Sequence, residues 1–144
     1  MGQQQLLLII LVSIIVTISI VLAVNTFGER VAQSNRDVVR QDLLSGATSA
    51  QVIYTRPASI GGAGEDFTRV GDDLLPRLLA PVTEIEPGVW GNENGIYEIV
   101  DVEESSFSIR GKPSSSDPAL VLTVRFLEDN HEWIVSIADQ DEES

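Results

Sequence analysis

Hydrophobic residues follow three different patterns along this chain of 144 residues. The first is a continuous apolar stretch from Leu6 to Val24, which contains no charged residue. As an α-helix it is about 28 Å long, close to the hydrocarbon thickness of a bilayer. Most of its residues are β-branched, which predicts a stiff helix surface suited to close packing.

Three interpretations of this stretch remain open from its residues alone. A cleaved secretory signal normally has a basic flank and a small-residue exit, and this stretch has neither. A membrane anchor fits the length and the apolar composition. A helix that is first in the membrane and later in a bundle of identical helices also fits. That helix would exclude charge along its whole length, and it explains why three uncharged glutamines precede Leu6.

The second pattern is an amphipathic helix that continues from the first and ends at Arg56-Pro57. Its apolar positions recur at steps of three, four or seven residues, so they form one stripe. We expect this stripe to pack on a sheet, through Ala32, Val39, Leu43, Ala47, Ala50 and Tyr54. The segment from Asn25 to Gly28 predicts a kink or a locally melted turn, and Gly46 a second weak point, because glycine disfavours helix by about 1 kcal/mol.

A glycine-rich loop follows the helix. It lacks the pattern of a phosphate-binding loop. A short helical turn starting at Asp72 or Asp73 comes next, and Pro76 keeps it short or lies in its first turn. The acidic pairs of the chain lack the EF-hand spacing, which favours solvated surface over a weak calcium site between Gly61 and Asp66.

The third pattern begins at Trp90, where the apolar period changes to two. Four segments alternate in this way, which predicts a four-stranded antiparallel meander followed by an acidic tail. The segments are GIYEIVDV, SSFSIRG, PALVLTVRFLED and HEWIVSIAD. The predicted fold class is therefore α+β, with a long N-terminal helix packed on a small C-terminal antiparallel sheet.

The chain divides by composition into four parts. The predicted parts are an apolar helix over 1–27, an amphipathic helix over 28–56, a loop region with a short helix over 57–89, and the sheet with its acidic tail over 90–144.

The net charge is strongly negative, and the predicted apolar helix over 1–27 carries none of it. There are 22 acidic and 9 basic residues, for a net charge of −13, and all of them lie from Glu29 onward. This balance argues against nucleic acid as a partner. It indicates either a soluble, self-repelling surface or adaptation to high salt.

Candidate catalytic chemistry is sparse. The single histidine, His131, is expected on an exposed turn, and no Ser/His/Asp set can be built around it. Trp90 and Trp133 are interpreted as residues of the sheet core. There is no cysteine. We therefore predict a protein that is not an enzyme, with no cofactor and no metal site.

The layout resembles the type IV pilin superfamily. The start GQQQLLLIILVSIIV is similar to the segment that a prepilin peptidase cuts, and the resemblance makes Gly2 the residue before the cut and Gln3 the mature N-terminus. The stretch from Asn35 to Thr68 is similar to a bacterial pilin-like group with a glutamine-rich start. Leu7 stands where the common pattern has glutamate, as in archaeal pilins and flagellins.

The resemblance implies a structural subunit of an extracellular filament that serves adhesion or motility. Its partners would be further copies of itself, the inner membrane before assembly, the pilus assembly machinery and the prepilin peptidase. The expected filament core comprises Leu6, Ile10, Ile14, Ile15, Ile18 and Val21. The alternatives are a minor pseudopilin of a secretion system and a monomeric membrane-anchored binding module.

Overall fold

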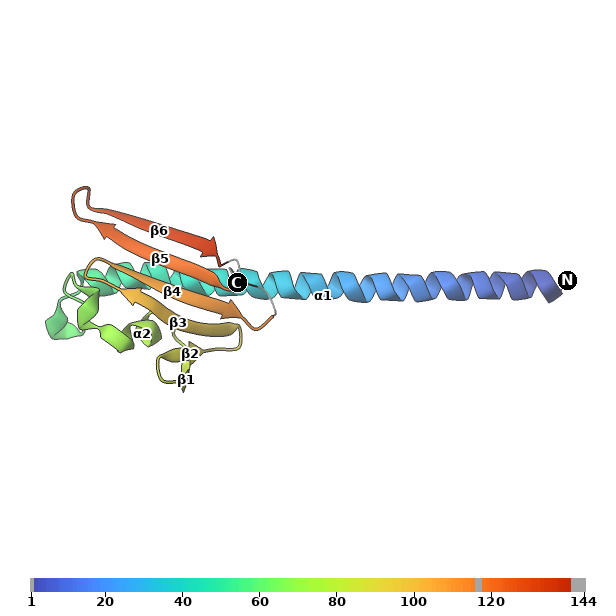
Figure 1. The fold of residues 1–144 in the computed structure, drawn as a ribbon, viewed down its shortest axis with the longest axis horizontal. Coiled ribbons are helices and arrows are strands. Elements are labelled where there is room, and N and C mark those ends of the chain that lie inside the picture. Colours follow the sequence, from blue (N-terminus) through green and yellow to red (C-terminus); the bar gives the residue numbers. More distant parts are fainter. Residues whose placement is uncertain (1, 116–117, 141–144) are drawn as a thin grey trace. The chain divides into compact units, whose positions relative to one another are not determined.

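One long helix, α1 (Gly2–Thr55), begins the chain and runs through two structural units (Figure 1). The computed structural model describes residues 2–115 and 118–140. The first unit comprises residues up to Ser34, and the second begins at Asn35. The predicted acidic tail comprised residues 139–144; Asp139 instead belongs to the last strand of the sheet, and residues 141–144 lie outside the described residues.

The helix is continuous where a break was predicted. Helical backbone extends through Asn25–Gly28 and through Gly46, so the predicted locally melted turn is wrong and the helix does not break at the second weak point. A single glycine costs about 1 kcal/mol, which the flanking helical turns offset. Gly46 instead marks a close contact, because a Cβ atom there would lie 2.9 Å from Cδ2 of Leu79.

The sheet confirms the predicted α+β class and contains six strands in chain order, each antiparallel to the next. The strands are β1 (Thr83–Glu86), β2 (Val89–Gly91), β3 (Gly95–Val102), β4 (Ser106–Pro113), β5 (Leu120–Leu127) and β6 (Glu132–Asp139). The prediction of four strands was wrong, because it missed β1 and β2. These two are short, and every residue of β1 is exposed, so neither strand carries a clear alternation of buried and exposed positions.

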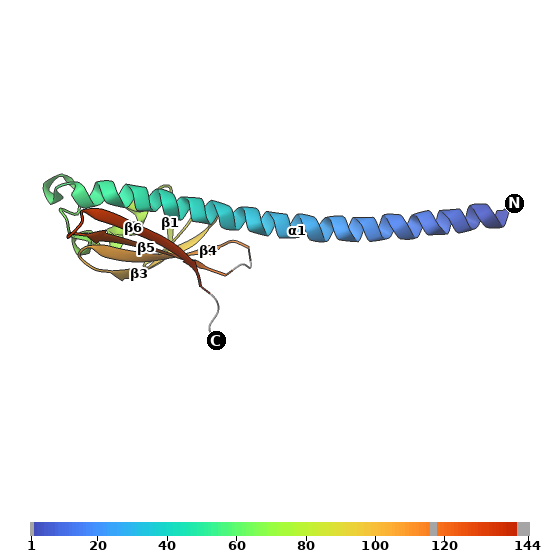
Figure 2. The same ribbon diagram turned by 90° about the horizontal axis from the view of Figure 1, so that it is seen from above.

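The helix lies along one face of the sheet in the second unit (Figure 2). The two approach closely where the sheet has glycines. A Cβ atom on Gly111 would lie 3.0 Å from Val39 and 3.2 Å from Leu43, and one on Gly95 would lie 3.2 Å from Val39. The absence of side chains at these two strand positions therefore lets α1 lie close to the sheet.

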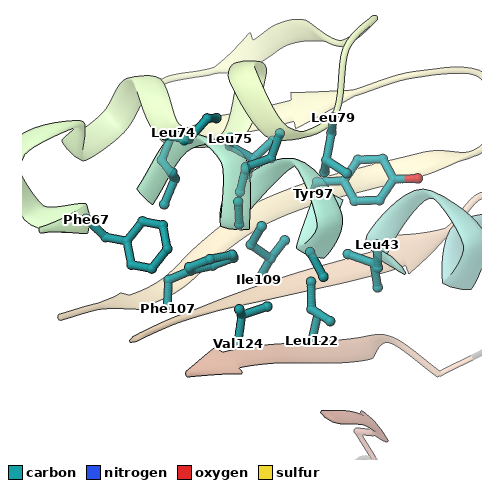
Figure 3. Close-up of a cluster of buried hydrophobic side chains, with 14 of the residues drawn as sticks. Leu43, Phe67, Leu74, Leu75, Leu79, Tyr97, Phe107, Ile109, Leu122 and Val124 are labelled. Carbon is teal, nitrogen blue, oxygen red and sulfur yellow. The ribbon is translucent and has the colours of Figure 1, made fainter. Parts of the chain in front are cut away.

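The segment between helix and sheet completes the core. It forms three 3₁₀ turns, η1 (Ala58–Ile60), η2 (Phe67–Arg69) and η3 (Gly71–Asp73), followed by the short helix α2 (Leu74–Leu78). Pro76 lies in the first turn of α2, where its missing N–H is tolerated. The side chains of Phe67, Leu74 and Leu75 are fully buried beside Phe107 and Ile109 of the sheet (Figure 3).

Candidate functional site

The apolar first part of α1 is the most unusual surface of the molecule. Its large apolar side chains are between 47% exposed, at Ile10, and 65% exposed, at Leu7 and Val24. The six residues expected to form a filament core all belong to this surface: Leu6, Ile10, Ile14, Ile15, Ile18 and Val21. An apolar surface of this extent marks a site of contact with protein or membrane.

The few polar groups in this stretch are satisfied within the helix. The hydroxyls of Ser13, Thr17 and Ser19 each donate a hydrogen bond of 2.8 Å to the carbonyl four residues earlier. Such back-bonding leaves no free hydroxyl donor on the helix surface. The stretch therefore offers a partner apolar contact on every side.

This helix is long and apolar enough to cross a membrane, and no residue of its most apolar stretch is buried within the protein. A signal sequence near an N-terminus meets the same criteria, so length and composition leave both roles open. Gly2 and Gln3, the residues of the expected processing site, lie at the start of α1 and are exposed.

The stripe predicted to pack on the sheet divides between the two units. Val39, Leu43, Ala47, Ala50 and Tyr54 are buried in the core of the second unit. Ala32 is half-buried and belongs to the first unit. At the end of the stripe the ring of Tyr54 packs against three aromatic rings, with centroid separations of 4.9 to 5.2 Å to Phe67, Phe126 and Trp133.

A polar cluster around Asp42 joins the helix to the sheet and was not predicted from the sequence. Oδ2 of Asp42 accepts hydrogen bonds from Asn92 at 3.0 Å, from Asn94 at 2.9 Å and from the hydroxyl of Tyr97 at 2.7 Å. Asn35, which precedes Asp42 by about two turns of α1, donates a hydrogen bond of 2.9 Å to the backbone carbonyl of Asn94. The cluster therefore fixes the turn between β2 and β3 against α1.

The environment of Asp42 keeps it charged. Partial burial raises its pKa, but the hydrogen bonds from Asn94, Tyr97 and Asn92 outweigh burial and hold the pKa below its ordinary value. Burial, followed by the bond to this carboxylate, raises the pKa of Tyr97 well above its ordinary value. At neutral pH Asp42 is thus an ionised acceptor and Tyr97 a neutral donor, which is the arrangement of a structural anchor.

The remaining candidate residues occupy structural positions. His131 is exposed in the turn between β5 and β6, with its ring centroid 6.1 Å from that of Phe126. Trp90 and Trp133 are partly buried and pack against the core. Asp66 caps a 3₁₀ turn by accepting from the amide of Thr68 at 3.0 Å. Among the described residues, no three His, Cys, Asp or Glu side chains gather as metal ligands.

No family model, curated protein or solved structure matches this chain.

Proposed function

We propose that this protein is a structural subunit of a type IV pilus-like extracellular filament, held together by bundled N-terminal helices and serving adhesion or motility. The observation that carries the proposal is the uncharged surface from Leu6 to Val24, which is apolar on every side and exposed along its whole length. A helix that is hydrophobic all round requires a surrounding of lipid or of protein.

Packing energetics favour neighbouring helices as the final surrounding. Moving an apolar helix from lipid to protein gains little hydrophobic free energy, so association depends on close van der Waals packing. The β-branched side chains of this stretch are stiff, so they lose little conformational freedom when they interlock. The absence of charge at its glutamine-rich tip suits an end that is buried as well.

The distribution of charge supports the same arrangement. Every charged residue lies from Glu29 onward, so a fibre core built from the apolar stretch contains none. The second unit, with its own core, then coats the fibre with an acidic and soluble surface.

Membrane insertion of the same helix precedes assembly in this proposal. A stretch of this length matches the bilayer. That match also favours a second candidate function, a monomeric membrane-anchored binding module, which differs in having no contact between apolar helices. A minor pseudopilin would share the fold but would be rare in any filament.

Shearing of the cell surface tests the proposal. Electron microscopy of the sheared material should reveal thin fibres, and peptide mass analysis should identify this chain as their main component, beginning at Gln3 if Gly2 marks the processing site. Recovery of the chain only from the membrane fraction, as a monomer in detergent micelles, would contradict the filament and favour the anchored module. Fibres in which this chain is a trace component would favour the minor subunit.

A further inference from the structure

An open groove of about 660 Å³ lies beside the last turns of α1, inside the unit that begins at Asn35. Its apolar lining includes Val52 and Ile60, which are 53% and 67% exposed. Its charged lining residues are Arg56 and Arg77, and no acidic residue lines it in the part of the chain that the structure describes. In a chain of net charge −13, a groove whose charges are both positive stands apart from the rest of the surface.

The two arginines differ in how they are held. Arg77 is fixed, because Nη1 donates to the carbonyl of Gly61 at 2.6 Å and Nη2 lies 3.9 Å from the exposed carboxylate of Asp73. The side chain of Arg56 makes no hydrogen bond or ion pair within the described ranges 2–115 and 118–140. Arg56 is therefore available to an acidic partner, while Arg77 offers a guanidinium in a set position.

The sequence contains a segment of matching charge. Three consecutive acidic residues, 141–143, follow β6 almost directly. The groove of the same copy lies toward the other end of the second unit's helix. Asp139 forms ion pairs with Arg36 and Arg40, which places the end of β6 beside the start of the second unit's helix, whereas the groove lies beside the last turns of that helix.

The distances can be estimated from chain geometry. Residue 38 is midway between Arg36 and Arg40, and residue 54 is midway between Val52 and Arg56 of the groove. Between these two positions the helix rises about 24 Å. An extended chain advances about 3.4 Å per residue, so a stretch of four residues after Asp139 spans at most about 14 Å, less than this rise. A second copy, displaced along the helix axis, would bring its groove to the level of this acidic segment.

We propose that the acidic segment 141–143 of one copy docks in the Arg56–Arg77 groove of a neighbouring copy. This inference rests on the proposed filament, in which neighbours share one orientation and are displaced along the fibre axis. Carboxylates pair with the two guanidinium groups at the rim, and the exposed apolar side chains of Val52 and Ile60 are covered by the docked chain.

Cross-linking between two kinds of subunit tests the contact, because the natural chain has no cysteine. Chains carrying Val52→Cys and chains carrying Ser144→Cys are assembled into mixed fibres and mildly oxidised. We expect disulfide-linked dimers joining position 52 to position 144, identified from the linked peptides. Ile85→Cys, on exposed β1, replaces Val52→Cys as the control and should yield several-fold fewer dimers with Ser144→Cys.

Charge reversal adds a readout that proximity alone would not give. Arg56→Glu in the Val52→Cys chain should lower the yield of linked dimers several-fold. Glu142→Lys and Glu143→Lys in the Ser144→Cys chain should restore it. Fibres whose yield equals that of the Ile85→Cys control, or is insensitive to Arg56→Glu, would overturn the contact and leave the filament intact. A failure to form any fibre would overturn the filament and this contact together.

A detergent-dispersed monomer carrying both Val52→Cys and Ser144→Cys tests the reach argument. We expect little disulfide within one chain. An efficient internal disulfide would show that the segment occupies its own groove, and would overturn docking between copies.

Discussion

The first half of α1 (residues 2–28) and its second half (residues 29–55) place apolar side chains in different ways. In the second half, exposure changes sharply from one residue to the next: Leu43 is fully buried against the sheet, whereas its neighbour Leu44 is 46% exposed. In the first half no such contrast exists, and Ile14 and Ile15 are 51% and 54% exposed. The second half therefore has one covered face, and the first half has none.

This difference indicates what each half requires. A helix with one apolar face and one polar face needs a single partner to cover the apolar face, and here the sheet of the same chain is that partner. A helix that is apolar on every side needs several partners at once, which a bundle of identical helices or a bilayer provides. The sheet domain can thus be stable in the single chain, while the first half remains incomplete without its surroundings.

The largest expected effect comes from placing a charge in the first half. Ile14→Asp should abolish fibres, because an unpaired carboxylate buried in every subunit costs several kcal/mol each time. Membrane insertion can survive, since one acidic residue at mid-helix costs only about 3 kcal/mol on insertion scales. Electron microscopy of sheared material is the measurement. Leu44→Asp, on the exposed side of the second half, is the matched control and should leave fibres present. Normal fibres with Ile14→Asp would contradict the core assignment.

A smaller effect separates the two leucines of the second half. Leu43→Ala should lower the free energy of unfolding of the second unit by about 2–5 kcal/mol, because it leaves a cavity in the core. Leu44→Ala should change it by less than about 0.5 kcal/mol. Both tryptophans lie in the second unit, so urea unfolding of the full chain in detergent can be followed by their fluorescence. Equal losses for the two variants would show that the helix does not pack on the sheet through Leu43.

Asp42 should contribute less, and its contribution should depend on pH. Its folded pKa is below the unfolded value, so its stabilisation is present above about pH 4 and is lost as the pH falls through the folded pKa. Asp42→Asn should cost about 1 kcal/mol at neutral pH, because the carboxylate is only partly buried and water screens it. Unfolding of both proteins across a pH series should bring their stabilities together at acidic pH. A constant difference down to pH 2 would contradict this account of Asp42.

The smallest effect concerns the acidic surface outside the fibre core. Repulsion between neighbouring second units extends over about 30 Å at low ionic strength and over about 3 Å in molar salt. Fibres should therefore melt a few degrees higher in molar sodium chloride than in dilute buffer, since salt does not weaken the apolar core. A series repeated with chelator separates ionic strength from calcium binding. A melting temperature that stays flat with added salt would show that the charge serves only solubility, and one that falls would show that attractive ion pairs between copies outweigh the repulsion.

The overall layout could be predicted because the order of helix and strands follows from the local spacing of apolar residues. The change from helical spacing around Leu43 to alternation after Trp90 is sufficient for an α+β fold. The continuity of α1 at Gly28 and Gly46 could not be read from propensity alone, because a small local cost does not decide whether a long helix breaks. Strands β1 and β2 lacked a signal, since every residue of β1 is exposed and β2 has only three residues, too few to show an alternation.

The polar sites depend on distant parts of the chain, so local patterns could not reveal them. Asp42 meets donors that follow it by 50, 52 and 55 positions. Its only signal in the sequence is a charged residue directly beside the apolar stripe. The groove likewise combines Arg56 at the end of α1 with Arg77 in α2, and the glycine-rich loop between them brings the two together.

Electron cryo-microscopy of purified fibres tests the central claim most directly. The account predicts a helical fibre whose axis is filled by the segment from Leu6 to Val24 of many copies, with Ile14 packed between neighbouring helices. The second unit of each copy should form the outer layer. A fibre in which this segment lies outside the core, or purified protein in which lipid or detergent surrounds a single apolar helix, would contradict the account.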